Sequence, residues 1–229
     1  MNTKIKLLTV FFSAGAIAFA SACNTAPTNI TNQNTAVVRS NAAVSESGNL
    51  MNGNAMTKTD GMPMNHSEMK GSPNAATAPY DLQYLDSMSM HHQGGVMMAQ
   101  MMVEKTKNPE LKAFAQKMIV DQNREIAEMK HWREKWFAGK PMAMNMEMTG
   151  MGGSMKGMDM KKLQSSSGKE FELEFFNQMI PHHEGAVAMA KESLTKAEHP
   201  EIKTLSSQII KTQEAEIKQM AEWKTKWSK

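Results

Sequence analysis

The chain has 229 residues, of which 21% are charged, and its formal net charge is +3. This near balance excludes both a polycation that binds nucleic acid through charge alone and an acidic tail protein. Methionine is the unusual residue, because its 25 copies outnumber the 23 aspartates and glutamates combined, while the mean hydropathy stays at −0.49. A thioether can fill irregular space in a core or bind a soft metal ion, so the positions of the methionines must decide between the two uses.

The first 22 residues have the pattern of an export signal. Two lysines precede an apolar run over residues 7–20, which is too short to span a bilayer of about 30 Å as a helix. Small residues then lead to Cys23, the single cysteine of the sequence. This ending resembles a bacterial lipoprotein signal, so we expect a signal peptide over residues 1–22 and a lipid anchor at Cys23. The protein would then be exported to the periplasm or cell surface, with the outer membrane favoured where the cell has one. A plain signal peptide that leaves a free thiol is the alternative.

Residues 23–78 are predicted to be a disordered tether. They are rich in Asn, Thr, Ser, Ala, Gly and Met, and they hold too few large apolar side chains to offset the entropy lost on ordering. Met62, Met64 and His66 near its end are expected to be auxiliary metal ligands.

Residues 79–138 are predicted to form a hairpin of two helices. Apolar side chains recur every three or four residues from Leu85 to Met102 and again from Leu111 to Trp136. Between these runs, Asn108-Pro109 supplies a helix cap and a first helical residue. A connection this short makes the two helices antiparallel neighbours.

Residues 139–168 are predicted to be a flexible crossover. The methionines here fall at spacings of two, three and four with glycines between them, which is not the pattern of a helix that buries one face. We therefore expect them to collect metal ions in a mobile segment and not to pack in a core. The auxiliary ligands expected in this segment are Met142, Met144, Met146, Met148 and Met151.

Residues 169–229 repeat the first hairpin. Aligning the His-His pair at 182 with the pair at 91 sets an offset of 91 residues, which holds without a gap over residues 80–137 and 171–228. Two such hairpins can bury their apolar faces only against each other. The expected fold class is all-α, an antiparallel four-helix bundle of two duplicated helical hairpins with disordered Met-rich segments.

Polar residues within the apolar faces mark a candidate site. Counting from each hairpin turn puts each His pair at the height of a Gln-x-x-Glu motif on the second helix, with methionines about one turn away. The residues of this layer are Met88, His91, His92, Gln122, Glu125 and Met129 in the first copy and Met179, His182, His183, Gln213, Glu216 and Met220 in the second. Such a network could simply fix the register of the hairpins, but its repetition with methionines in both copies favours metal binding.

The two copies resemble a known family. The segments DLQYLDSMSMHHQGGVMMA and FELEFFNQMIPHHEGAVAMA, each followed by Gln-x-x-Glu-Ile-x-x-Met-x-x-Trp, are similar to the family called domain of unknown function 305 (DUF305). The resemblance covers about residues 80–137 and 170–228. It implies a ferritin-like bundle, often exported, with copper binding in some members, and it adds Met98 and Met189 to the site. Glu172 in place of the usual Asp and Ser89-Met90 in place of the usual Ile-Pro depart from the family pattern.

Ligand softness selects the metal. Thioethers and imidazoles without a thiolate suit Cu(I), with Cu(II) and Ag(I) as further candidates, whereas iron or manganese would require more carboxylates. We expect a lipoprotein that sequesters, buffers or hands on copper in copper tolerance or homeostasis. Its partners would be copper ions, the membrane and another copper-handling protein, and not nucleic acid.

Two other functions compete with copper binding. Glu128-x-x-His131 is typical of a ferritin-like di-metal oxidase, but the second copy lacks this match and no further buried glutamates complete a carboxylate cage. A structural or partner-binding bundle would instead use its methionines as an adaptable apolar surface. The sequence offers no Ser/His/Asp or Cys/His arrangement and no glycine-rich phosphate loop, so an enzyme is not expected.

Overall fold

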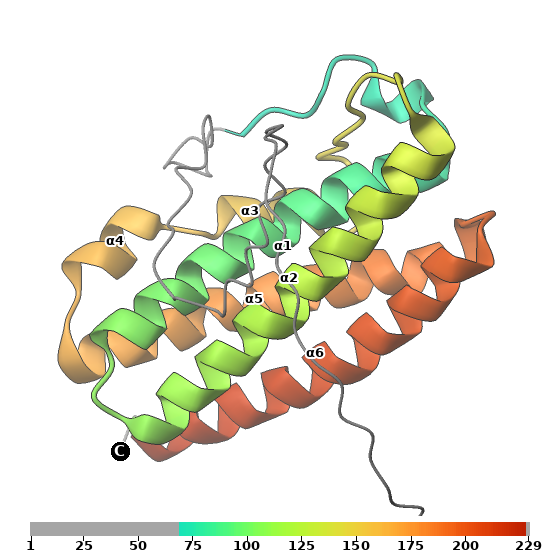
Figure 1. Ribbon diagram of the computed structural model, residues 1–229. Helices are drawn as coiled ribbons and strands as arrows, with labels where there is room; N and C mark the ends of the chain where they lie inside the picture. The colour runs from blue at the N-terminus through green and yellow to red at the C-terminus, as the bar shows by residue number, and fades with distance from the viewer. Residues whose placement is uncertain (1–68, 228–229) are drawn as a thin grey trace, which may run out of the picture. The chain divides into compact units, whose positions relative to one another are not determined.

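The computed structural model describes residues 69–227, and four long helices make up most of this part of the chain. Their bounds are α1 Tyr80–Lys105, α2 Pro109–Phe137, α5 Gly168–Lys196 and α6 Pro200–Trp227. Helices α1 and α2 form one antiparallel pair and α5 and α6 form the other, each joined by a short turn (Figure 1). The predicted all-α bundle of two helical hairpins is confirmed.

Local signals in the sequence set where the second helix of each hairpin begins. The side-chain oxygen of Asn108 accepts hydrogen bonds from the backbone N–H groups of Glu110 and Leu111, at 2.9 and 3.4 Å. Pro109 and Pro200 are the first residues of α2 and α6, where the missing N–H of a proline costs no helical hydrogen bond. The chain therefore turns sharply at both places, and each hairpin closes on itself.

The core lies between α1 and α5, which pack against each other, while α2 packs on α1 and α6 on α5. Removing each large apolar side chain from water stabilises the fold by about 1.5–3 kcal/mol. The largest fully buried side chains are Tyr84, Leu82, Leu85, Met88, Met98, Met102, Leu111, Met118, Met129, Phe171, Phe175 and Phe176. Methionine is therefore a principal core residue of this bundle.

The crossover between the hairpins is ordered, so the prediction of a flexible segment over residues 139–168 is wrong. It contains the short helices α3 (Met151–Lys156) and α4 (Met160–Ser165), which contact α1 and α5. Its buried methionines are Met144, Met148, Met151, Met155, Met158 and Met160. Spacing misled the prediction because an unbranched thioether with three rotatable bonds can pack from an irregular backbone as well as from a helix.

The end of the predicted tether is also ordered where the structure describes it. Residues 69–78 include a 3₁₀ turn at Ala75–Thr77, and the backbone N–H of Ser72 donates to the Met144 carbonyl at 2.8 Å. The Met144 N–H donates in return to the Ser72 hydroxyl at 3.1 Å. These bonds fix the segment on the crossover. The prediction of a disordered tether over residues 23–78 is therefore wrong for residues 69–78. The predicted signal peptide, Cys23, Met62, Met64 and His66 lie outside the described residues.

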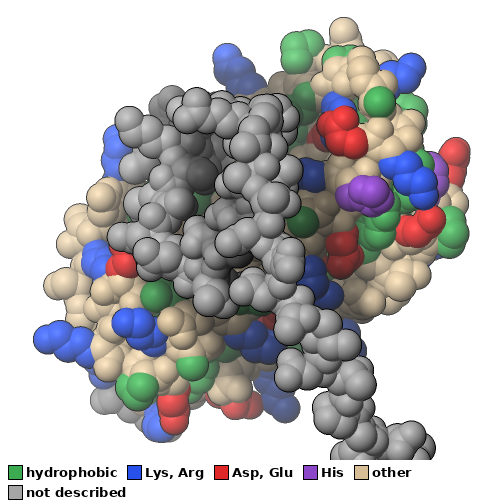
Figure 2. All heavy atoms as spheres, in the orientation of Figure 1, with side chains coloured by type: hydrophobic (Ala, Val, Ile, Leu, Met, Phe, Trp, Pro, Cys, Tyr) green, Lys and Arg blue, Asp and Glu red, His purple; other side chains and the backbone are tan. Residues whose placement is uncertain are grey.

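The surface carries mixed charge. On the face seen in Figure 2, basic and acidic side chains are interspersed wherever grey atoms do not cover them. Among residues 69–227, no helix combines the length and the apolar character that crossing a membrane requires. The charge pattern on this face agrees with the small net charge of the chain and offers no basic stripe of the kind that binds a phosphate backbone.

Candidate metal site

Two histidine pairs meet at the centre of the bundle. His91 and His92 lie on α1, His182 and His183 lie on α5, and all four are buried. The rings of His91 and His182 stack across the contact between the hairpins, with centroids 3.7 Å apart and an interplanar angle of 27°. Because these residues are equivalent in the two copies, the stack lies where the duplicated halves face each other.

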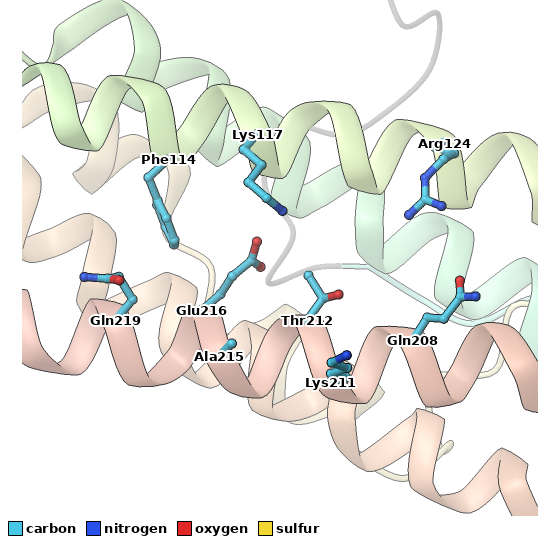
Figure 3. A pocket seen from close by; sticks show the side chains of 9 residues that line it. All are labelled: Phe114, Lys117, Arg124, Gln208, Lys211, Thr212, Ala215, Glu216 and Gln219. Atoms are coloured by element: carbon cyan, nitrogen blue, oxygen red, sulfur yellow. The ribbon is translucent and has the colours of Figure 1, made fainter. Parts of the chain in front are cut away.

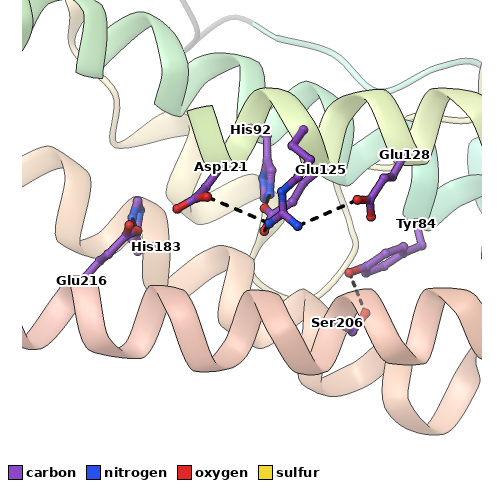
Figure 4. A network of polar contacts seen from close by, with 9 residues as sticks. Tyr84, His92, Asp121, Glu125, Glu128, His183, Ser206 and Glu216 are labelled. Carbon is purple, nitrogen blue, oxygen red and sulfur yellow. Dashed lines mark hydrogen bonds and ion pairs between the residues drawn. The ribbon is translucent and has the colours of Figure 1, made fainter. Parts of the chain in front are cut away.

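The second histidine of each pair is oriented by a carboxylate on its own hairpin (Figure 4). His92 Nε2 lies 2.7 Å from a Glu125 oxygen, and His183 Nε2 lies 2.8 Å from a Glu216 oxygen. Since a carboxylate only accepts, each Nε2–H donates, and Nδ1 is the ring nitrogen left to bind another group. Neither Nδ1 has a hydrogen-bond partner. A carboxylate that orients an imidazole whose other nitrogen is free is the usual surrounding of a metal-binding histidine.

His91 is held by the crossover. Its Nε2 lies 2.9 Å from the hydroxyl of Ser154, and that hydroxyl donates its own proton to the Gly150 carbonyl at 2.6 Å. The Ser154 oxygen must therefore accept from His91 Nε2–H, which leaves a lone pair on His91 Nδ1. This Nδ1 is buried and has no partner either.

His182 is the least satisfied member of the layer. Neither of its ring nitrogens has a hydrogen-bond partner in good geometry, although the residue is 1% exposed, and the only polar group that acts on the ring as a hydrogen-bond partner is the backbone of His91. Both polar atoms of the Gln122 side chain and the Oε1 of Gln213 are likewise buried without partners. Unpaired buried polar atoms cost about 1–3 kcal/mol each, so a cluster of them indicates a bound ion or water.

Burial keeps the stacked pair uncharged. It lowers the pKa of both His91 and His182 well below the ordinary histidine value, and the neighbouring histidines lower it further. The backbone carbonyl of His91 acts in the opposite direction on the pKa of His182, as the smallest of these effects. Neutral imidazoles are the form that binds metals, so no proton has to be displaced from this pair near neutral pH.

The predicted methionine ligands differ in burial between the long helices and the crossover. Those on the long helices are fully buried, and they are Met88, Met98, Met129, Met179, Met189 and Met220. Of the auxiliary crossover residues, Met144, Met148 and Met151 are buried, Met146 is partly buried, and Met142 is 55% exposed. The auxiliary methionines are therefore mostly part of the packed structure.

A groove leads from the surface towards this layer. It lies between α2 and α6 and has a volume of about 560 Å³ (Figure 3). Its lining residues are Phe114, Lys117, Arg124, Gln208, Lys211, Thr212, Ala215, Glu216 and Gln219. Because Glu216 also accepts the hydrogen bond from His183, the floor of the groove is one side chain away from the second histidine pair.

Histidine, cysteine and carboxylate side chains alone do not form a complete metal site in the described part of the chain, and this holds for the four histidines of the layer as well. Within residues 69–227, no three His, Cys, Asp or Glu side chains are grouped so that they could hold a metal ion. Glu128 of the Glu-x-x-His match is 38% exposed and pairs with Arg124 at 3.9 Å, and His131 is exposed. A di-metal centre with a buried carboxylate cage therefore has no support here.

Two residues near the histidines escaped the sequence analysis. Ser154 and Met158 come from the crossover, which has no second copy to be aligned with. The available signal was the equivalent glycine pair Gly94 and Gly185, each three residues after the first histidine of its pair. A missing Cβ at matched positions of both copies indicates that something packs closely against them.

The fold and the site define a duplicated helical bundle of one family. The sequence profile of the domain of unknown function 305 (DUF305) matches residues 24–133 and 130–224. The chain belongs to the DUF305 family, as the histidine and methionine pattern predicted. No curated protein sequence matches the chain significantly.

Solved structures are similar to this chain over the bundle. CopM in its Cu(II)-bound form is 42% identical, with 64% of this chain and 97% of CopM covered and a TM-score of 0.57. CopM in its Cu(I)-bound form is 40% identical, with 64% and 96% covered and a TM-score of 0.55, and Ag-bound forms also match. A DUF305 protein from Streptomyces coelicolor is 27% identical, with 66% and 93% covered and a TM-score of 0.57.

Proposed function

We propose that this protein binds copper in the layer of buried imidazoles between its two hairpins. The observation that carries the proposal is the set of lone pairs left on His91, His92, His182 and His183, all buried and without hydrogen-bond partners. In His92 and His183 the opposite nitrogen is tied to a carboxylate, an arrangement that fixes the ring for a metal ion. A purely structural network would be expected to satisfy these atoms.

Copper is the metal that these donors favour. Imidazole nitrogens and thioether sulfurs suit Cu(I), and the imidazoles also suit Cu(II), whereas manganese or magnesium would need several carboxylates. CopM, which is similar to this chain over most of its own length, has been solved with Cu(II), Cu(I) and Ag. We infer that Cu(I) is the preferred ion and that Cu(II) and Ag(I) also bind.

We infer that the protein sequesters, buffers or hands on copper and does not carry out chemistry on it. The groove between α2 and α6 gives an ion or a copper-handling partner a route towards Glu216 and His183. The histidines and the methionines of the long helices are all buried, and this burial would keep bound copper away from water. This arrangement fits a role in copper tolerance or homeostasis.

We also propose that the protein is exported and anchored to a membrane by lipid at Cys23. The support is the sequence pattern alone: two lysines, an apolar run and small residues before the cysteine. Cys23→Ala should shift the protein from the membrane fraction to the soluble fraction of an expressing bacterium and abolish labelling by a radioactive fatty acid. Unchanged fractionation and labelling would contradict the anchor and leave the copper site untouched.

The copper site is tested by anaerobic titration of Cu(I) against a chromophoric chelator. The wild type is compared with the quadruple variant His91→Ala/His92→Ala/His182→Ala/His183→Ala and with His131→Ala, an exposed histidine, as a control outside the layer. We expect the quadruple variant to lose at least one high-affinity copper ion and the control to retain it. Equal uptake by all three proteins would overturn the proposal.

A second measurement covers the case in which the quadruple variant does not fold. X-ray absorption of the copper-loaded wild type should show both nitrogen and sulfur neighbours around copper. A shell of oxygen neighbours alone would contradict the site. Strong binding of a protein partner together with weak uptake of every metal would favour the structural alternative.

A further inference from the structure

The crossover touches the bundle at two equivalent glycines, one in each copy. A Cβ on Gly185 would lie 2.5 Å from both the Ser154 Cβ and the Gly150 carbonyl oxygen. A Cβ on Gly94 would lie 2.9 and 3.1 Å from the Cε and Sδ atoms of Met158. The crossover therefore presses a hydroxyl side chain against one copy and a thioether against the other.

These two contacts make the stacked histidines inequivalent. Ser154 satisfies the Nε2 of His91, whereas no side chain forms a hydrogen bond with either ring nitrogen of His182. The His182 Nε2 lies 3.5 Å from the same Gly94 Cβ position that Met158 Sδ approaches to 3.1 Å. A buried ring nitrogen and a buried thioether sulfur thus both lie within 3.5 Å of one point beside the backbone of α1.

The geometry points to a soft-metal site formed by His182 Nε2 and Met158 Sδ, which would bind Cu(I) or Ag(I). This inference rests on the proposed function and adds to it a ligand from the crossover, which belongs to neither copy of the duplicated hairpin. One imidazole and one thioether are a donor set that suits a soft monovalent ion of low coordination number. Gly94 is needed because any side chain there would take the space of the Met158 sulfur.

The competing explanation is that Met158 only fills space. It is 2% exposed, and a thioether can be a core residue without any metal. Replacing Met158 by leucine separates the two explanations. Leucine has a similar volume, so it can fill the space, but it has no sulfur lone pair and cannot bind a metal ion. Met160 provides the matched control, since it is a buried methionine of the same crossover, 3% exposed.

The direct test follows the methionine methyl groups on Ag(I) binding. The protein is labelled with ¹³C-methyl methionine and titrated with Ag(I), and the Met158 and Met160 resonances are assigned from Met158→Leu and Met160→Leu. We expect the Met158 resonance to shift with the first equivalents of Ag(I), while the Met160 resonance stays in place. In His182→Leu the Met158 shift should disappear.

Affinity gives a second readout. Met158→Leu should lower the affinity for the most tightly bound Cu(I) ion by at least about tenfold and leave the unfolding temperature of the metal-free protein unchanged. Met160→Leu should change neither the affinity nor the unfolding temperature. If Met158→Leu binds as the wild type does and the Met158 methyl does not move, this inference is wrong. The proposed function fails separately, when the quadruple histidine variant retains all copper uptake.

Discussion

At the scale of single residues, the buried histidines tie the stability of the metal-free protein to pH. His91 and His182 remain neutral in the folded chain, because burial lowers their pKa well below the ordinary value, about 6.5. In the unfolded chain both take up a proton as the pH falls through that value. The unfolded state then binds more protons than the folded state, so the free energy of unfolding decreases as the solution becomes more acidic.

We predict that this pair lowers the free energy of unfolding of the metal-free protein between pH 7 and pH 5, by at most about 4 kcal/mol, the limit for two imidazoles that protonate only in the unfolded chain. The measurement is urea denaturation at both pH values with a chelator present. The control is His91→Leu/His182→Leu, which keeps every other titratable group and should lose much less stability over the same interval. Equal losses in the two proteins would show that the stacked histidines are not the cause.

The residues of the candidate layer could be predicted because the duplication showed them twice. Counting from the hairpin turn placed His92 and His183 at the heights of Glu125 and Glu216, and the hydrogen bonds at 2.7 and 2.8 Å join these pairs. The stack of His91 on His182 could not be predicted, because it depends on how the two hairpins face each other. Nothing in the spacing within one hairpin contains that information.

At the scale of secondary-structure elements, the long helices followed from periodicity and caps, but the crossover did not. Its residues lack a regular apolar period, and this pattern predicts a flexible segment, yet Met151, Met155 and Met158 are buried. Gly150 turns the chain there with a φ of 85°, a left-handed conformation that favours glycine. Tertiary contacts therefore order a segment whose local sequence predicts no element.

We predict that Gly185→Ala destabilises the protein, because the new Cβ would collide with Ser154 and with the Gly150 carbonyl, at 2.5 Å. Backbone and a short side chain cannot yield as a long flexible one can, so the crossover must move, at a cost of about 1–3 kcal/mol. Gly94→Ala would crowd only the flexible end of Met158, since His182 Nε2 lies at an ordinary contact distance of 3.5 Å, so it should change stability less.

Chemical denaturation of the metal-free variants checks this order. Gly153→Ala serves as the control, because its Cβ would have no neighbour within 4 Å. That substitution should stabilise the short helix slightly, since alanine loses less backbone entropy than glycine. If Gly185→Ala were as stable as Gly153→Ala, the close packing of the crossover on α5 would be disproved.

At the scale of the whole molecule, the two hairpins hold each other at opposite ends of the bundle (Figure 1). Asp81 at the start of α1 accepts hydrogen bonds from the backbone N–H groups of Glu198 and His199, at 3.0 and 2.9 Å. The equivalent residue at the start of α5, Glu172, accepts from the Thr106 hydroxyl at 2.5 Å. Each hairpin thus uses its first helix to fix the turn of the other.

These two contacts, which we call the Asp81 clamp and the Glu172 clamp, differ in strength. Asp81 is 3% exposed and also accepts from His199 Nδ1 at 2.5 Å, and the His199 ring stacks on Trp136 with centroids 3.8 Å apart. Glu172 is only partly buried and has a single partner in the turn. Removing Asp81 leaves several donors without an acceptor, whereas water can replace the one bond of Glu172.

We therefore predict that Asp81→Ala lowers the free energy of unfolding by about 2–4 kcal/mol and that Glu172→Ala lowers it by less than about 1 kcal/mol. Asp81→Asn should fall between them, because an amide keeps one acceptor oxygen but loses the charge. Urea denaturation of the three variants at neutral pH measures the order of their free energies of unfolding.

Because both clamps set how the hairpins face each other, Asp81→Ala should also weaken copper binding at the His91 and His182 stack. A loss of equal size for Asp81→Ala and Glu172→Ala would mean that burial does not distinguish the clamps and that the turns contribute alike.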